Sequence, residues 1–187
     1  MNESADALPT ETMTVEEFAS WSSGTDGRFE LIDGRVVRMQ SELRIHSVAK
    51  VRVTNVLQEA IERAGLDCRA LVDGPMVTVD DDQSFVPDAS VECGPEGAGL
   101  YNENPVVVVE VLSPGSQGID YGDKLQRYFR NPLVFHYLVV DPQKRTTTHF
   151  RRVGDNAEVS IGAQRIIRLE PPGLSVDTEA FFPLTVD

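Results

Sequence analysis

The chain has 187 residues, of which 41% are hydrophobic and 25% are charged, as is typical of one soluble globular domain. Its 30 acidic and 17 basic residues give a net charge of −13, so the chain as a whole lacks the positive charge that strengthens non-specific nucleic-acid binding. Any activity on nucleic acid would therefore need a local basic patch or bound cations.

The polar, acidic N-terminus predicts a disordered leader over residues 1–12, followed by a single domain over 13–187. The leader lacks the basic and apolar regions of a signal peptide, and no apolar run in the chain is long enough to span a bilayer. Cys68 and Cys93 show no CxxC spacing, which predicts neither a zinc site nor a disulfide framework, and we interpret both as small strand residues. These features predict a cytoplasmic protein with no membrane partner.

Three elements are expected in the first third of the chain. Residues 14–17 (TVEE) fit a capping box, which predicts a short helix from about Val15 to Trp21. The segments RFELI and RVVRM flank Asp33-Gly34, which is a strong signal for a β-hairpin. Apolar residues then recur at helical spacing over residues 42–64, with Gly65 at the position of a C-cap, so this should be the longest helix.

The middle of the chain reads as a series of strands. CRALVD, PMVTVD and FVPDASVEC each predict one strand, and a glycine-rich loop over residues 94–104 follows them. The central strand is expected over Val106–Leu112, where an almost continuous β-branched run indicates burial on both faces.

The last third predicts a crossover and a hairpin. A helix from about Tyr121 to Arg130 is followed by the buried strand LVFHYLVVD, and then by a hairpin of TTTHFRRV and AEVSIG. In the tail, Phe181 and Phe182 are expected to pack on the core. A strand–helix–strand crossover within a meander of strands predicts a mixed-sheet α/β domain with helices on its faces.

Glu110 interrupts the apolar central strand, where an ionised carboxylate is costly unless it is paired or coordinated. One explanation is a bound metal ion. The other is a buried ion pair with Lys124 or Arg127, since structural ion pairs also perturb carboxylates. The pattern alone leaves both explanations open.

Asp88, in a Pro-Asp dipeptide, and Lys124, near the first turn of the helix after the central strand, are the candidate neighbours of Glu110. Two carboxylates on adjacent strands offer the hard oxygen ligands that Mg²⁺ prefers, and a nearby lysine can orient water or stabilise charge. This combination recurs in phosphodiester hydrolysis. Asp88 taken alone is more often a turn residue than a ligand.

Other polar residues are open to two interpretations. Glu30, in the first hairpin strand, is a third acidic group of the site or a solvent-facing hairpin residue. His46, near the start of the long helix, is a base or a surface and capping residue. Tyr128, one helical turn after the lysine, supports the site or packs in the core. His136 and His149 lie in strands without a partner at metal-ligand spacing, and we interpret both as structural.

Several segments in this order resemble the Uma-two family of restriction-endonuclease-like proteins, within the PD-(D/E)xK nuclease superfamily. The segments are MTVEEFASW, RFELIDGRVVRM, the helix with His46, FVPDASV, PVVVVEVLSPGS, DYGDKLQRYFRNPLVFHYLVVDP and THFRR. The resemblance covers roughly Met13 to Phe182. It implies an α/β fold with a restriction-endonuclease-like core, in which a mixed central β-sheet is flanked by helices, and an acidic site that binds Mg²⁺ or Mn²⁺.

Matched residue by residue, Asp88 corresponds to the aspartate of the PD element and Glu110 to the acidic residue of the (D/E)xK element. Glu30 resembles the upstream acidic residue of the family, and His46 matches a histidine in the same helix. The resemblance therefore groups these four side chains in one site.

The sequence departs from the superfamily pattern at the lysine, because Leu112 stands two residues after the glutamate. The basic role is expected to move to Lys124, since a helix packed back on its strand can aim a long side chain at the end of that strand. Tyr121 stands where an arginine often follows the aspartate in the family, which removes a local positive charge.

The implied function is that of a Mg²⁺-dependent endodeoxyribonuclease that hydrolyses DNA phosphodiester bonds. Asp88, Glu110 and the Val111 carbonyl are expected to hold Mg²⁺ or Mn²⁺, and Lys124 is expected to position or activate water. The residues expected to assist in metal binding or proton transfer are Glu30 and His46. A homodimer is expected by analogy with superfamily members that cut both strands.

The alternative is a non-catalytic binding or regulatory protein on the same scaffold. Its acidic cluster would be a residual ion-pair network, and the net charge of −13 favours it. The two hypotheses differ in one observable: whether Asp88, Glu110 and Lys124 converge on a cleft that solvent can reach.

Overall fold

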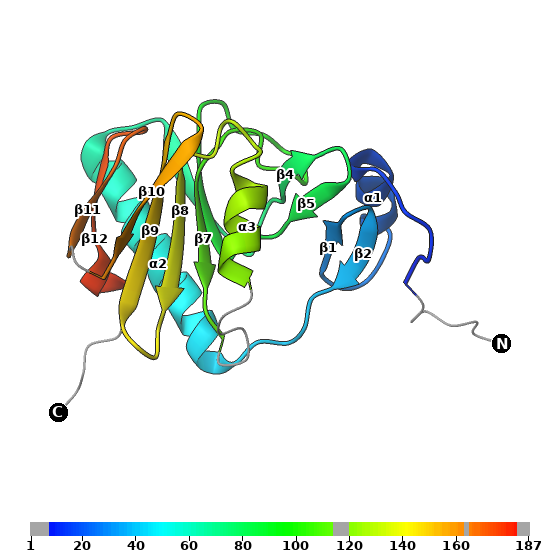
Figure 1. Cartoon of the computed structure of the whole chain (residues 1–187), viewed down its shortest axis with the longest axis horizontal. Coiled ribbons are helices and arrows are strands. Elements are labelled where there is room, and N and C mark those ends of the chain that lie inside the picture. Colours follow the sequence, from blue (N-terminus) through cyan, green and yellow to red (C-terminus); the bar gives the residue numbers. More distant parts are fainter. Residues whose placement is uncertain (1–7, 114–119, 163–164, 183–187) are drawn as a thin grey trace.

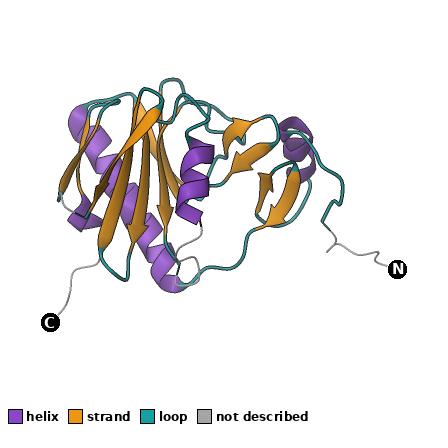
Figure 2. Cartoon of the chain, in the orientation of Figure 1, coloured by secondary structure: helices purple, strands orange, loops and turns teal. Residues whose placement is uncertain are grey.

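The computed structural model describes residues 8–113, 120–162 and 165–182, without the side chains of residues 120 and 121 (Figure 1). Its elements are α1 (Val15–Ser22), β1 (Phe29–Ile32), β2 (Arg35–Arg38), α2 (Arg44–Ala64), β3 (Cys68–Val72), β4 (Val77–Asp80), β5 (Gln83–Phe85), β6 (Ala89–Cys93), β7 (Pro105–Val111), α3 (Asp120–Tyr128), β8 (His136–Asp141), β9 (Thr146–Val153), β10 (Asn156–Ile161), β11 (Ile166–Leu169), β12 (Leu174–Asp177) and a 3₁₀ turn (Thr178–Phe181). The strands form three sheets, the largest of which lies at the centre of the molecule (Figure 2).

The N-terminal part joins α1 to a four-stranded sheet of order β2-β1-β5-β4. The predicted capping box is confirmed, because Thr14 and Glu17 exchange side-chain and backbone hydrogen bonds at the start of α1. The predicted hairpin is also confirmed, and Asp33 (φ 51°) and Gly34 (φ 72°) make the left-handed turn between β1 and β2. Phe18 of α1 is fully buried in the apolar cluster under this sheet.

The central sheet has six strands in the order β10-β9-β8-β7-β6-β3. Only β7 and β8 run parallel, and α3 connects them, so the predicted strand–helix–strand crossover is confirmed. The other neighbours pair antiparallel. The sheet is therefore mixed, as the sequence predicts.

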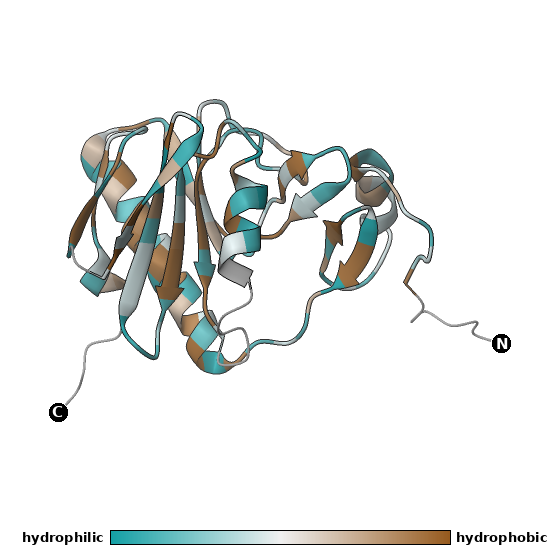
Figure 3. Cartoon of the chain, in the orientation of Figure 1, coloured by the Kyte–Doolittle hydropathy of each residue, from teal (hydrophilic) through white to brown (hydrophobic). Residues whose placement is uncertain are grey.

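Helices cover both faces of this sheet. On one face, α2 buries Ala49, Val53 and Leu57 among the inward residues of β6, β7 and β8, next to the β11–β12 hairpin and the predicted phenylalanines of the tail. On the other face, α3 packs Tyr128 against β8. Apolar segments follow the central strands, and α2 alternates between apolar and polar patches (Figure 3). The expected α/β architecture, a mixed central sheet flanked by helices, is confirmed.

The segment FVPDASVEC does not form the single strand that its composition predicts. β5 ends at Phe85 and β6 begins at Ala89, and these two strands belong to different sheets. Pro87 lies in the break, where it has no N–H to give to a strand ladder. The chain thus passes from one sheet to the next at the Pro-Asp dipeptide. Neither β11 nor β12 was anticipated from the sequence.

Both cysteines lie in strands, as predicted, but the expectation that they form no disulfide is wrong. Cys68 of β3 and Cys93 of β6 form a disulfide. They lie directly opposite each other in the antiparallel β3–β6 pair. Their separation of 25 residues carried no recognisable spacing signal, because the pairing depends on strand register and not on local sequence.

The N-terminal segment is described from Leu8 onwards. Residues 1–7 of the expected leader lie outside the described residues, and Leu8 packs against the apolar cluster of α1. Among the described residues, no helix is both long enough and apolar enough to cross a membrane.

Candidate active site

A cleft of about 400 Å³ opens beside the ends of β6 and β7 and the start of α2. It brings together all six residues that the sequence nominates for the site. These are Glu30, His46, Asp88, Glu110, Val111 and Lys124. They come from β1, α2, the β5–β6 connection, β7 and α3, so the cleft depends on the whole fold.

The pairing of β6 with β7 places Asp88 beside the end of β7. Ala89 lies opposite Val109, and the N–H of Val111 donates a 2.6 Å hydrogen bond to Asp88 Oδ2. The carbonyl oxygen of Val111 lies 2.6 Å from Nε2 of His46. Two of the predicted metal ligands are therefore fixed against each other by the backbone of β7.

Glu110 lines the cleft and receives two hydrogen bonds on Oε1, from Lys124 Nζ at 3.1 Å and from the Tyr128 hydroxyl at 2.8 Å. Burial raises the pKa of Glu110 to about 7. The positive charge of Lys124 opposes this shift, and the negative charge of Asp88 adds to it. The ion pair with Lys124 is thus present. Arg127, the other suggested partner, bonds instead to Asp33.

Lys124 reaches the cleft from α3, as the family resemblance implies. Burial alone would lower its pKa, but the negative charges of Glu110, Glu30 and Asp88 together outweigh burial and raise the pKa of Lys124. The amine is therefore a cation at neutral pH. Tyr128, one turn later, both packs in the core and supports the glutamate, so both interpretations of this residue hold.

Asp88 is buried and surrounded by donors. Its Oδ1 lies 3.3 Å from Lys50 Nζ, and its Oδ2 lies 3.2 Å from His46 Nε2. Burial would raise the pKa of Asp88, but His46, the Val111 N–H and Lys50 outweigh it and lower the pKa. Asp88 is therefore a carboxylate in the cleft.

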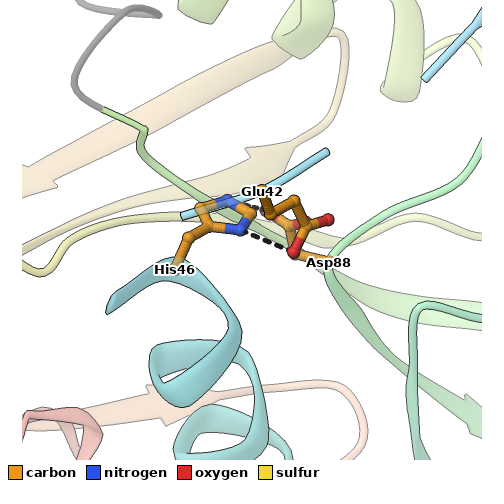
Figure 4. A group of neighbouring side chains, drawn as sticks. All are labelled: Glu42, His46 and Asp88. Carbon is orange, nitrogen blue, oxygen red and sulfur yellow. Dashed lines mark hydrogen bonds and ion pairs between the residues drawn. The ribbon is translucent and has the colours of Figure 1, made fainter. Parts of the chain in front are cut away.

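His46 lies between two carboxylates (Figure 4). Its Nδ1 is 3.1 Å from Glu42 Oε2, while its Nε2 faces Asp88 and the Val111 carbonyl. Burial would lower its pKa, but Asp88, followed by Glu42, raises the pKa of His46 to about 9. The ring is buried, so the interpretation of His46 as a surface residue is wrong.

Sequence reasoning missed Glu42 and Lys50. Lys50 is 1% exposed, and its Nζ contacts Glu42, Asp73 and Asp88. His46 and Lys50 lie four residues apart in α2, which places them on one side of the helix, whereas Glu42 precedes the N-cap residue Leu43. The spacing from His46 was a signal that could have found Lys50.

Glu30 is the acidic residue contributed by β1. Its side chain is buried, and its Oε1 accepts a 3.1 Å hydrogen bond from the N–H of Val86. It lines the cleft with the other acidic residues, and the surrounding protein covers most of its surface. The hairpin interpretation of Glu30 as a solvent-facing residue is therefore wrong.

The arrangement has the chemistry of a cation site. Glu42, His46 and Asp88 each offer a ligand atom within 4.8 Å of the others, and the Val111 carbonyl and the Glu110 carboxylate border the same cleft. Carboxylate and carbonyl oxygens are the ligands of hard divalent cations, and imidazole is a ligand of transition metals. The donor set therefore fits a divalent metal.

Comparisons with known proteins agree with this fold. A crystal structure described as a putative nuclease belonging to DUF820, from Anabaena variabilis, superimposes with a TM-score of 0.65 at 18% identity, over 90% of this chain and 97% of that one. An uncharacterized protein of Synechocystis sp. is 27% identical over 167 residues, which are 88% of this chain and 87% of that protein. Residues 15–184 match the family described as Uma2, putative restriction endonuclease. The chain therefore belongs to the Uma2 family.

Proposed function

We propose that the protein is a metal-dependent endonuclease that hydrolyses DNA phosphodiester bonds. The family description and the nuclease-like fold support the reaction class. The single observation that carries the proposal is the convergence of Asp88, Glu110 and Lys124 on one cleft that solvent reaches. A residual ion-pair network would have no need of an open cleft.

The cation would be held by Asp88, Glu110 and the carbonyl oxygen of Val111. Mg²⁺ or Mn²⁺ bound there would polarise the phosphate and lower the pKa of water. These oxygens are already oriented without it, because the N–H of Val111 fixes Asp88, and Tyr128 fixes Glu110. Such pre-orientation reduces the reorganisation needed on binding.

Lys124 supplies the positive charge that the missing ExK lysine would give. Its amine donates to Glu110 Oε1 and borders the cleft, where it orients water or stabilises charge on the phosphate. Glu30 lines the same cleft and assists by accepting or holding a proton. These roles need no additional cofactor.

The acidic balance of the chain restricts how DNA would bind. With a net charge of −13, phosphate neutralisation must be local. Lys124 and the bound cation supply that charge at the cleft. We therefore expect DNA binding to depend on divalent metal more strongly than in a basic nuclease.

A cleavage assay tests the proposal. Supercoiled and linear DNA are incubated with the protein and Mg²⁺, Mn²⁺ or EDTA, and with Asp88→Ala, Glu110→Ala and Lys124→Ala. We expect metal-dependent cleavage by the wild type and its loss in the first two variants. Unchanged activity in those two would overturn the assignment of the site. No cleavage by the wild type on any substrate would favour a non-catalytic binding or regulatory protein.

We further propose a homodimer working on DNA in the cytoplasm. Two copies would supply the two sites that cutting both strands requires. Sedimentation of the purified protein tests the dimer, and a monomer at micromolar concentration would contradict it. In the cytoplasm Cys68 and Cys93 would be kept reduced, so recovery of the bridged protein from freshly lysed cells would argue against this compartment. Cell fractionation decides that point.

A further inference from the structure

We propose that His46 binds the metal directly through Nε2, with Glu42 holding its ring, so that the site prefers a first-row transition-metal dication to Mg²⁺. The inference rests on the proposed function, because it assigns a metal class and a further ligand to the same cleft. It comes from the positions of the two ring nitrogens and their partners.

The Nε2 atom of His46 lies among the proposed oxygen ligands. It is 2.6 Å from the carbonyl oxygen of Val111 and 3.2 Å from Oδ2 of Asp88. A cation held by those two oxygens would therefore meet the imidazole nitrogen and would displace the Nε2 proton to solvent, because a histidine ligand binds a metal in its neutral form. Of the three histidines in the sequence, only His46 lines this cleft.

The other ring nitrogen is already engaged. Nδ1 of His46 lies 3.1 Å from Oε2 of Glu42, and Oε1 of the same glutamate contacts Lys50 and Arg28. Histidine ligands of metals typically donate their second N–H to such a carboxylate, which fixes the tautomer and the ring orientation. Because Glu42 lies at Nδ1, whereas the proposed oxygen ligands lie at Nε2, Glu42 acts as a positioning residue rather than a direct ligand.

The scaffold under His46 is rigid. The imidazole is 7% exposed and projects from the first turn of α2, a helix of 21 residues. α2 is fixed to the central sheet by Ala49 and Val53, both buried. A ligand held in this way keeps its geometry whether or not the metal is present.

A nitrogen ligand determines the metal class. Mg²⁺ takes almost only oxygen ligands in octahedral geometry, whereas imidazole suits first-row transition metals. With Asp88 and a carbonyl oxygen beside His46, and Glu110 lining the same cleft, the mixed nitrogen and oxygen set fits Mn²⁺ or a later divalent ion. Mn²⁺ is the probe of choice, because its unpaired electrons couple magnetically to the nuclei of the ligand atoms, so a bonded nitrogen can be detected.

The test uses the untagged full-length protein, with histidine nitrogens either at natural abundance or labelled with ¹⁵N. Mn²⁺ binding is measured by electron paramagnetic resonance, in competition with Mg²⁺, and bonded nitrogen by electron spin echo modulation. We expect a ¹⁴N modulation that changes to ¹⁵N on labelling. We also expect Mn²⁺ to bind at least about 10-fold more tightly than Mg²⁺.

Three variants separate the roles of the residues. His46→Gln keeps a donor to the Val111 carbonyl but should remove the nitrogen modulation. Glu42→Gln should keep that modulation and weaken Mn²⁺ binding about 10- to 100-fold, the usual effect of losing a carboxylate behind a ligand. His149→Gln, in β9 and outside the cleft, is the matched control and should change neither. Circular dichroism verifies that each variant folds.

Two results would overturn the inference: Mn²⁺ bound by the wild type without histidine modulation, or an unchanged signal in His46→Gln. DNA cleavage measured on the same samples separates this inference from the proposed function. Cleavage that depends on Asp88 without histidine modulation would refute the inference and leave the nuclease assignment standing. Histidine-bound Mn²⁺ without cleavage would support the inference and refute the nuclease assignment.

Discussion

Lys50 provides the most direct test of how the cleft is built. Its side chain is 1% exposed, and its ammonium contacts the carboxylates of Glu42, Asp73 and Asp88. Lys50→Met keeps the length and the apolar packing of the stem but removes the charge. It leaves Asp88, which is 8% exposed, without one of its cations.

The magnitude follows from the burial of the partners. Removing one member of a buried ion pair typically costs 3–5 kcal/mol, because the remaining charge is left uncompensated. Glu42 and Asp73 are 20% and 39% exposed, so water relieves part of the effect on them. We therefore expect Lys50→Met to lower the free energy of unfolding by about 3 kcal/mol.

Lys144→Met is the matched control. This lysine is 65% exposed and pairs with Asp141 at 3.5 Å, as a surface ion pair worth about 0–1 kcal/mol. Urea unfolding at pH 7 gives the free energy of unfolding of both variants. If the free energy falls with urea concentration at a similar slope in each, the difference in midpoint reports a difference in stability. A loss for Lys50→Met no larger than that for Lys144→Met would refute the account of Lys50 as the cation that holds Glu42, Asp73 and Asp88 together.

Three further predictions concern the scaffold. His136 and His149 share a 2.9 Å hydrogen bond, and burial lowers the pKa of each to about 4. Below pH 6.5 the unfolded chain therefore binds more protons than the folded protein. Protonation of one of the two histidines in the unfolded chain should lower the free energy of unfolding by roughly 3 kcal/mol as the pH drops from 6.5 to 4. NMR that finds both rings protonated in the folded protein at pH 5.5 would contradict this. Tyr128→Phe removes a buried hydroxyl donor to the cleft glutamate and should cost about 1.5–3 kcal/mol in urea unfolding, and a change below about 0.5 kcal/mol would argue against that bond. Cys68 and Cys93 are 25 residues apart, so by the chain-entropy relation reduction of their bridge should lower the free energy of unfolding by about 3.5 kcal/mol. Identical unfolding with and without reductant would show that no bridge forms.

The fold was predictable where its signals are local. The capping box at Thr14, the turn at Asp33-Gly34 and the helical periodicity closed by Gly65 all formed as expected, because each depends on neighbours along the chain. The split of FVPDASVEC at Pro87 was not predicted, because strand propensity does not say which sheet a strand joins.

The site was predictable in part for the same reason. Glu110 stands out as a charge in an apolar strand, and Lys124 follows on the helix that packs back on it. The contact of Lys50 with Asp73 could not be predicted, because Asp73 reaches Lys50 from the β3–β4 turn, and only the tertiary fold brings the two together. The disulfide escaped prediction for the same reason, since strand register creates it.

The central claim is that the carboxylates of this cleft carry out metal-dependent hydrolysis of DNA. The most direct measurement is the rate of plasmid cleavage in Mn²⁺ for wild type, Asp88→Asn and Glu110→Gln. Glu92→Gln is the matched control, because Glu92 is a partly buried carboxylate paired with Arg69 away from the cleft. The account predicts loss of cleavage by at least about 100-fold in the two cleft variants and near wild-type cleavage in the control. Equal rates in all four proteins would contradict it.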